Sequence, residues 1–136
     1  MEYWLTVLKN PTGNEAIDEF AVTIDNIPKI VFSCTLQHVN WKTAKLAKRD
    51  LKEEVSTLRQ SRNDGSKDIL VGSRSLIIAL LNFNLIDEFQ LCVHPIIAGK
   101  GLPLFENIND RIDLTLLKTK PFGCGAVIFY YEPVKK

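Results

Sequence analysis

Residues 68–76 read Asp-Ile-Leu-Val-Gly-Ser-Arg-Ser-Leu, and this stretch decides the fold. Residues 69–71 are continuously apolar, which is typical of a short strand covered on both faces. Gly72 permits a tight turn, and an apolar helix at residues 76–83 begins within three residues of it. A buried strand that runs directly into a helix indicates an α/β protein with parallel strands.

The sequence on either side continues this alternation of helices and strands. The sequence contains no recognisable repeat and no linker. We expect first a helix that opens with a capping box at Thr12 and Glu15 and ends before Pro28, then a strand at residues 29–33 and a weakly signalled strand at 41–47. A helix capped by Asp50 and ended by turn residues 63–66 comes next, followed by the strand at 68–72 and the helix at 76–83. The chain continues with a strand-like alternation at 89–94, a loop at 95–103 with a short helical turn at 104–105, and a hairpin of residues 112–119 and 126–132 around a turn at 123–125.

This order predicts a three-layer α/β/α sandwich with a mixed, mainly parallel sheet and a C-terminal antiparallel hairpin. The length of 136 residues suits one domain over residues 1–136. Apolar residues make up 46% and charged residues 24%, with a net charge of +1, so no charge imbalance steers the chain toward nucleic acid or anionic membrane.

Several features point to a soluble protein of the cytoplasm. The longest clean apolar run, residues 76–81, is far shorter than the roughly 20 residues that cross a bilayer, and the first residues lack the pattern of a secretory signal. Three widely spaced cysteines, Cys34, Cys92 and Cys124, predict neither a disulfide framework nor a zinc site. His38 and His94 have no partners at ligand spacing, so we expect no metal; a Cys–His nucleophilic pair stays open.

The junction between the strand at 68–72 and the following helix is the place with chemical content. Backbone N–H groups at the helix start point outward and the helix dipole is positive there. Ser73 and Ser75 add hydroxyl donors and Arg74 adds a cation. These groups predict a phosphate site at the carboxyl end of a parallel strand. The alternative is an ordinary helix N-cap after a strand.

Two further segments carry weaker signals. Ser33 and Thr35 follow the strand at 29–33, where they line the same crevice if the two strands are neighbours, or simply serve as turn residues. Residues 99–101 read Gly-Lys-Gly, which suits a phosphate contact, but the local pattern favours a strand bulge and turn. They are no P-loop, because the glycine spacing and the Lys-Ser/Thr pair are missing.

In this order, the motifs resemble one family. The segments that carry the resemblance are Pro-Lys-Ile-Val-Phe-Ser-Cys-Thr-Leu at 28–36, Asp-Ile-Leu-Val-Gly-Ser-Arg-Ser-Leu at 68–76, Leu-Ile-Asp-Glu-Phe at 85–89, His-Pro-Ile-Ile-Ala-Gly-Lys-Gly-Leu-Pro-Leu-Phe at 94–105 and Tyr-Tyr-Glu-Pro at 130–133. They look like the dihydrofolate-reductase-like family that includes the reductase (C-terminal) domain of the bifunctional riboflavin biosynthesis deaminase–reductase.

The resemblance implies an NADPH-dependent reductase that transfers a hydride to a small pterin-like or riboflavin-precursor-like heterocycle, commonly as a homodimer. Pro95 and the loop after it would face the substrate. The residues that would hold NADPH are Gly72, Ser73, Arg74, Ser75 and Leu76 at the pyrophosphate, and Ser33, Thr35 and Leu36 at the adenosine end. No catalytic residue follows from the resemblance; Asp87 and Glu88 are candidates by chemistry alone, against a simple role at the start of a surface strand.

The sequence departs from the family pattern at two places. Relatives often carry Arg after the serine that matches Ser33, where it can pair with the 2′-phosphate of NADPH, but this chain has Cys34. A preference for NADPH over NADH therefore depends on another cation, such as Arg74 or Lys45. Family members also usually begin with a strand, an active-site loop and a helix, and Tyr3-Trp4 matches a point after them. Three explanations stay open: a fragment or a misplaced start codon, a natural short form completed by dimerisation or strand exchange, and a non-enzymatic remnant. We therefore expect either a reductase or a non-catalytic, dimeric, cofactor-binding or structural remnant of the family.

Overall fold

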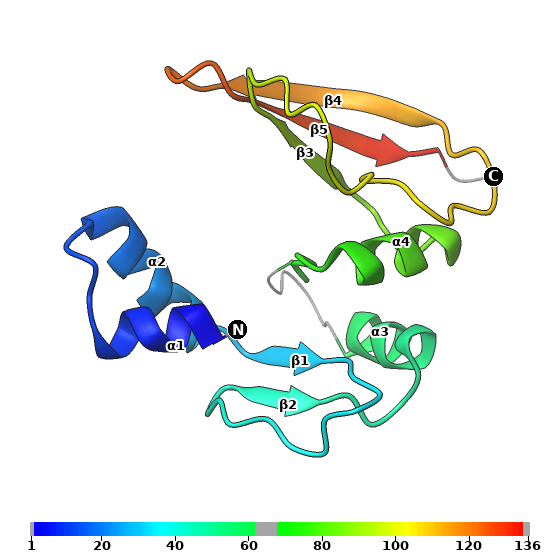
Figure 1. Ribbon diagram of the computed structural model, residues 1–136. Helices are drawn as coiled ribbons and strands as arrows, with labels where there is room; N and C mark the ends of the chain where they lie inside the picture. Colours follow the sequence, from blue (N-terminus) through cyan, green and yellow to red (C-terminus); the bar gives the residue numbers. More distant parts are fainter. Residues whose placement is uncertain (1, 62–67, 135–136) are drawn as a thin grey trace. The chain divides into compact units, whose positions relative to one another are not determined.

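The computed structural model describes residues 2–61 and 68–134 (Figure 1). The turn predicted at residues 63–66 lies outside them. The described chain is an α/β protein with four helices and small parallel and antiparallel sheets, and it divides into two compact units, Met1–Glu54 and Val55–Lys136. The expectation of one domain over the whole chain stays a prediction.

The first unit begins with a helical hairpin of α1 (Glu2–Lys9) and α2 (Glu15–Asn26). The rings of Trp4 and Phe20 meet edge to face with their centroids 5.0 Å apart, and Ala21 is completely buried. The sequence pattern did not predict α1, because eight residues that include aromatic and β-branched side chains have modest helix propensity. Packing against α2 is what stabilises so short a helix.

The N-terminus of α2 corrects the predicted capping box. Asn14 is the N-cap residue, and its side-chain oxygen accepts from the Ile17 N–H at 3.3 Å, so Glu15 is the first residue of the helix. Thr12 lies before the cap, where its backbone N–H and its hydroxyl donate to Asp18 at 2.9 Å. The capping-box spacing therefore predicted the correct helix but placed its N-cap residue two positions too early, because asparagine is as good an N-cap residue as threonine or better.

These contacts predict that the stability contributed by the N-terminus of α2 depends on pH. Hydrogen bonds from the backbone N–H of Thr12, its hydroxyl and the Gly13 N–H lower the pKa of Asp18, against an opposing effect of desolvation. A carboxyl whose folded pKa is lowered stabilises the fold above its unfolded pKa, about 3.9, and this contribution is lost as the pH falls through the folded pKa. We expect Asp18→Asn to remove that part of the acid dependence in urea titrations followed by circular dichroism. Equal acid dependence in both proteins would contradict the assignment.

A parallel pair of strands follows the helical hairpin. β1 (Lys29–Val31) pairs with β2 (Ala44–Leu46), with Ile30 opposite Lys45. Both strands were predicted, and the weakly signalled second one is confirmed, although each is only three residues long. The Lys29 N–H also donates to the Thr43 carbonyl at 2.8 Å, which extends the pairing by one bond.

Trp41 is the centre of the packing in this unit. Its side chain is 3% exposed, and its Nε1–H donates to Asp25 Oδ1 at 2.6 Å. The Lys29 ammonium lies 4.4 Å from the centroid of the indole ring and donates to Thr43 Oγ1 at 2.8 Å. Desolvation lowers the pKa of Lys29, and the nearby Asp25 charge opposes this effect. These contacts tie the end of α2 to the two strands.

The helix α3 (Leu51–Gln60) spans the boundary between the two units. Its predicted cap is confirmed, because Asp50 Oδ1 accepts from the Glu53 N–H at 2.9 Å. Val55 of the predicted apolar stripe is buried. Glu54 beside it is also buried, and one of its carboxylate oxygens has no hydrogen-bond partner.

The second unit corrects the expectation for residues 68–72. They form no strand, and the side chain of Leu70 is 88% exposed. A strand needs ladder partners for its backbone, and no described strand pairs with this segment. The helix after it, α4 (Arg74–Asn82), is present as predicted, beginning two residues early, and buries Leu80 and Leu81.

The remaining strands form an antiparallel sheet in the order β3-β5-β4. They are β3 (Phe89–Val93), β4 (Leu114–Pro121) and β5 (Val127–Pro133), and the predicted hairpin is confirmed. A bulge interrupts the β4–β5 register between Leu116 and Lys118. The described strands thus form a parallel pair and a larger antiparallel sheet, rather than one mainly parallel sheet, because residues 68–72 supply no parallel strand.

The hairpin turn makes one specific demand on its sequence. Gly125 has φ +85°, and a Cβ built there would lie 3.1 Å from Pro95 Cγ. We expect Gly125→Ala to lower the free energy of unfolding by about 1–3 kcal/mol, because the left-handed conformation and the close contact both disfavour a side chain. Gly123→Ala is the control, since a Cβ there would meet no heavy atom within 4 Å. Similar denaturation midpoints for the two variants would contradict this expectation.

Candidate functional site

The N-terminus of α4 is the first part of the candidate site. Ser73 is the N-cap residue by its extended backbone, but its side chain makes no capping hydrogen bond; its hydroxyl lies 3.1 Å from that of Ser75. The first helical hydrogen bond runs from the Ile77 N–H to the Ser73 carbonyl at 2.9 Å. The Ser73 side chain therefore leaves the N–H groups of the first turn uncapped, next to two exposed hydroxyls.

The space around Gly72, in front of this helix, is open. A Cβ built on Gly72 would meet no heavy atom within 4 Å, and the residue has no left-handed backbone that demands glycine. Space in front of uncapped N–H groups and a positive helix end is the arrangement that binds phosphate groups. The ordinary N-cap alternative is weakened, because the Ser73 hydroxyl does not cap the helix.

Arg74 has a structural task beside this site. Its guanidinium donates to the Pro103 carbonyl, and Nη1 lies 3.2 Å from Glu106 Oε2. Pro103 and Glu106 lie 29 and 32 residues along the chain, so spacing within the motif did not reveal them. The arginine therefore fastens the loop after β3 to the start of α4, and its charge is partly compensated by the carboxylate.

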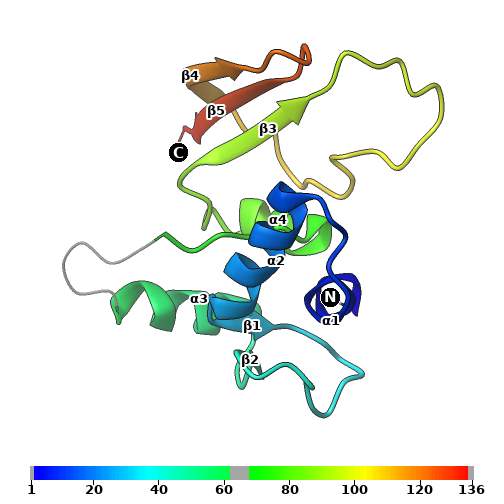
Figure 2. The ribbon, with the colours of Figure 1, turned by 90° about the vertical axis from the view of Figure 1, so that its left-hand side faces the viewer.

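The long loop between β3 and β4 (Figure 2) is anchored at several points. Its start packs at the hairpin turn, where Pro95 lies against Gly125. Asn82 at the end of α4 donates to the Asn107 carbonyl at 2.9 Å and accepts from the Asn109 N–H at 3.1 Å. The loop itself was predicted, but the helical turn at residues 104–105 was wrong, since they have no helical structure. Anchoring through side chains replaces local helical hydrogen bonds here.

The adenosine-side candidates lie in the first unit, after β1. Ser33 Oγ accepts from the Thr35 N–H at 3.2 Å and from the Leu36 N–H at 3.1 Å, which closes a tight turn. The three side chains are exposed, and the Leu36 side chain is 54% exposed. The hydrogen bonds support the turn alternative for Ser33. The crevice alternative depended on a neighbouring strand at residues 68–72, which form no strand, so a role of Ser33 and Thr35 in cofactor binding stays a prediction.

The acidic pair proposed from chemistry alone has other partners. Asp87 forms an ion pair with Arg59, at the far end of α3. Glu88 Oε1 accepts from Gln90 Nε2 at 2.8 Å, alongside the start of β3. Both acids are exposed, which matches the reading of a surface strand start.

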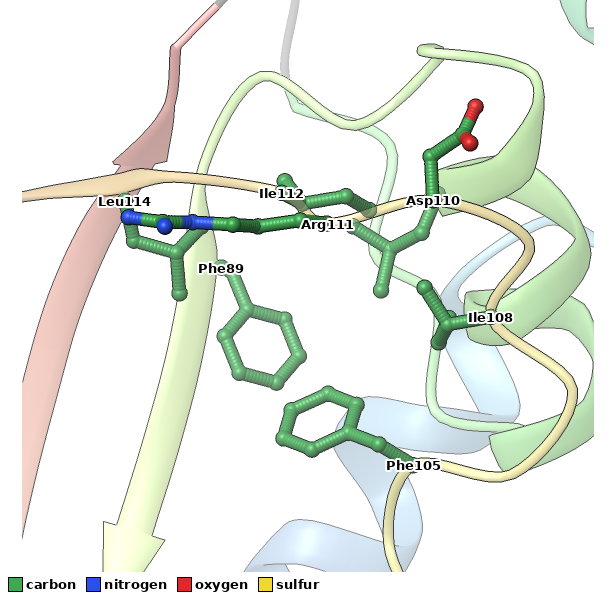
Figure 3. A pocket seen from close by; sticks show the side chains of 8 residues that line it. Phe89, Phe105, Ile108, Asp110, Arg111, Ile112 and Leu114 are labelled. Carbon is green, nitrogen blue, oxygen red and sulfur yellow. The ribbon is translucent and has the colours of Figure 1, made fainter.

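A separate apolar pocket of about 230 Å³ lies between α4 and the antiparallel sheet (Figure 3). The rings of Phe89 and Phe105 turn toward it, with their centroids 5.6 Å apart. Arg111 at its edge pairs with Asp113 at 2.8 Å. None of the cofactor candidates lines this pocket, and its lining resembles a packing gap more than a phosphate site.

The described residues were also inspected for metal sites and membrane spans. Within residues 2–61 and 68–134, no three histidine, cysteine or acidic side chains come together as a set of metal ligands. The helices of the same ranges are all too short or too polar to cross a bilayer.

The donor set at the start of α4 fits a dinucleotide pyrophosphate, because backbone N–H groups and hydroxyls are the groups that bind it. A cation for a 2′-phosphate is less evident. Arg74 is already paired with Glu106, Cys34 stands where relatives often carry an arginine, and Lys45 lies exposed on β2 in the first unit.

The fold and this site define a class, that of α/β proteins with a helix N-terminus open to a ligand. Residues 5–128 match the model of the RibD C-terminal domain, so the chain belongs to that family. It is similar to two uncharacterized proteins of Bacillus subtilis (strain 168): YyaP, 37% identical over 104 residues, and YwjB, 32% identical over 74 residues. The matches cover 76% and 54% of this chain but only 54% and 42% of YyaP and YwjB, so the chain spans about half the length of these relatives.

Solved structures agree with the fold. A "Putative riboflavin biosynthesis protein" from Shewanella sp. PV-4 superimposes with a TM-score of 0.69 over 98% of this chain and 88% of that chain. A pyrimidine reductase-like protein from Corynebacterium diphtheriae NCTC superimposes with a TM-score of 0.54 over 93% of this chain and 48% of that chain. Both are 19% identical to this chain, so they bear on its fold alone.

Proposed function

We propose that this chain is the cofactor-binding part of a reductase that uses NADPH to reduce a small heterocycle of pterin-like or riboflavin-precursor-like structure. Membership of the RibD C-terminal domain family supports the reaction class. The observation that carries the proposal is the uncapped N-terminus of α4 behind the open backbone of Gly72.

In this proposal the chain's own residues bind and orient the cofactor. Backbone N–H groups at Ser73, Ser75 and Leu76 would hold the pyrophosphate. Ser33, Thr35 and Leu36 would contact the adenosine end. NADPH would supply the hydride, while the protein supplies orientation and electrostatics.

Arg74 takes a positioning role in this scheme. Because it is fastened to Pro103 and Glu106, it would hold the loop that starts at Pro95, on the substrate side. Asp87 and Glu88 are not assigned to catalysis, since both serve exposed contacts at the start of β3.

A titration of the protein with NADPH tests the proposal. We expect the fluorescence of Trp4 and Trp41 to change with saturation, at a Kd well below about 1 mM, which corresponds to roughly 4 kcal/mol of binding free energy. NADH in a parallel titration measures the contribution of the 2′-phosphate. No saturable change with either cofactor at millimolar concentration would reject the reductase function.

The second candidate is a non-catalytic, dimeric, cofactor-binding or structural member of the same family. The lack of an assignable acid or base among the described candidates favours it. Oxidation of NADPH with a folate or a riboflavin precursor would reject this candidate, and cofactor binding without turnover would support it. Sedimentation tests the homodimer expected for both candidates, and a monomer at all concentrations would contradict it.

A further inference from the structure

The two faces of the antiparallel sheet differ in chemistry. Alternation along β3 places Phe89, Leu91 and Val93 on one face, where the Phe89 side chain is buried. Cys92 lies on the opposite face, and His94 follows two residues later on the same side. Both side chains are exposed, and Cys92 Sγ lies 3.7 Å from His94 Nε2. A thiol and an imidazole thus meet on the solvent side of the sheet.

The neighbours of this pair on the same face are mostly uncharged or basic. Ile128 of β5 lies opposite Cys92, and Lys120 of β4 lies opposite Ile128, so a cation stands two strands away in the same row. The next row holds Tyr130, with the Lys118 ammonium 4.4 Å from its ring centroid.

Acidic groups on this face lie farther along the strands. Glu88 precedes β3 and is four residues from Cys92, about 13 Å along a strand. Glu132 lies opposite Thr115 at the other end of β5 from Ile128. The charged side chains of the neighbouring rows on this face are therefore Lys118 and Lys120, whose positive charges attract an anionic reagent.

The chain provides its own comparison. Cys34, Cys92 and Cys124 are all free and exposed. Over residues 2–61 and 68–134, Cys92 is the cysteine whose sulfur is in hydrogen-bond contact with a histidine. All three thiols are thus exposed, and the contact with an imidazole distinguishes Cys92 from Cys34 and Cys124.

We propose that Cys92 and His94 form a thiol-modification site that reacts with small anionic disulfides. In the reaction, Cys92 Sγ attacks one sulfur of the disulfide, the S–S bond of the reagent breaks, and a mixed disulfide with Cys92 forms. The Cys92 proton passes to His94 Nε2, and the departing half of the reagent leaves as a thiolate with the electron pair. Cys92 is oxidised and the departing half is reduced, so the exchange balances.

Three single-cysteine proteins test this site, each keeping one of Cys34, Cys92 and Cys124 and carrying serine at the other two positions. Each is mixed at neutral pH with the anionic disulfide dithiobis(nitrobenzoate), and the release of coloured thiolate gives the rate. We expect the protein that keeps Cys92 to react on the order of tenfold faster than the other two, because the His94 imidazole lies within reach to accept the Cys92 proton as the sulfur attacks. Equal rates for the three proteins would overturn the proposal. All three proteins keep His94, so this comparison concerns the cysteines alone.

A second comparison tests the imidazole. His94→Gln in the protein that keeps only Cys92 should reduce its rate to that of the other two, while His38→Gln should leave it unchanged. Combining Lys118→Gln and Lys120→Gln should slow the reaction with the anionic reagent more than the reaction with the neutral reagent dithiodipyridine. An unchanged rate in the His94→Gln protein, with native circular dichroism, would also overturn the proposal.

Discussion

Gly72→Asp is expected to weaken NADPH binding by roughly 30-fold. The glycine precedes the uncapped first turn of α4, where the proposed pyrophosphate would lie. A carboxylate there repels a phosphate and competes for the same N–H groups. Like charges at contact distance cost between about 1 kcal/mol in water and about 4 kcal/mol near a protein surface, and about 2 kcal/mol corresponds to this change in Kd. Titration of tryptophan fluorescence with NADPH measures it.

Gly72→Asn is the matched control, because asparagine has nearly the shape of aspartate without its charge. A Cβ at Gly72 meets no heavy atom within 4 Å, so both variants should keep the wild-type stability within about 0.5 kcal/mol. We expect the asparagine variant to bind NADPH several-fold better than the aspartate variant. Equal affinities of the two variants would mean that the phosphates do not lie at this helix end.

Trp41→Ala is expected to lower the free energy of unfolding by about 3–5 kcal/mol. The indole is 3% exposed, so truncation leaves a cavity. It also removes the donor to Asp25 and the ring on which the Lys29 ammonium rests. Domains of this kind are stable by about 5–15 kcal/mol, so the variant should be close to unfolding at ordinary temperature. Urea denaturation followed by circular dichroism measures the loss.

Trp41→Phe separates the packing from the hydrogen bond. Phenylalanine fills much of the volume and keeps an aromatic face for Lys29, but it cannot donate to Asp25. We expect a loss of about 1–3 kcal/mol, well below that of the alanine variant. A change of less than about 1 kcal/mol in Trp41→Ala would show that this side chain is not central to the first unit.

Local patterns predicted the elements whose partners are near in the chain. The helix ends at Asp50 and Pro28 follow from capping and from proline geometry, and the hairpin follows from the glycines at its turn. Residues 68–72 carry an equally clear strand pattern, yet they form no strand, because a strand depends on a neighbour that its own residues do not specify.

In the candidate site too, local sequence patterns predict some features, while others depend on residues far apart in the chain. The start of a helix after Gly72 was predictable from a glycine and two serines before an apolar run, although the strand predicted in front of it does not form. The attachment of Arg74 to Pro103 and Glu106 was not, because contacts over 29 and 32 residues leave no periodic signal. The contact between Cys92 and His94 was predictable in part. Alternation along a strand puts residues two apart on one face, but it does not specify that their side chains touch.

The outer strand β4 also bears on how this chain behaves at high concentration. Among the described strands, β4 lies at the edge of its sheet. All eight of its residues are exposed, including Leu116 and Leu117, so this edge is a template on which a second molecule can add a strand. Lys118 and Lys120, the terminal Pro121 and the bulge between Leu116 and Lys118 are the features by which natural sheets oppose such growth. The lysines that make the sheet face attractive to anions thus also act as gatekeepers against aggregation.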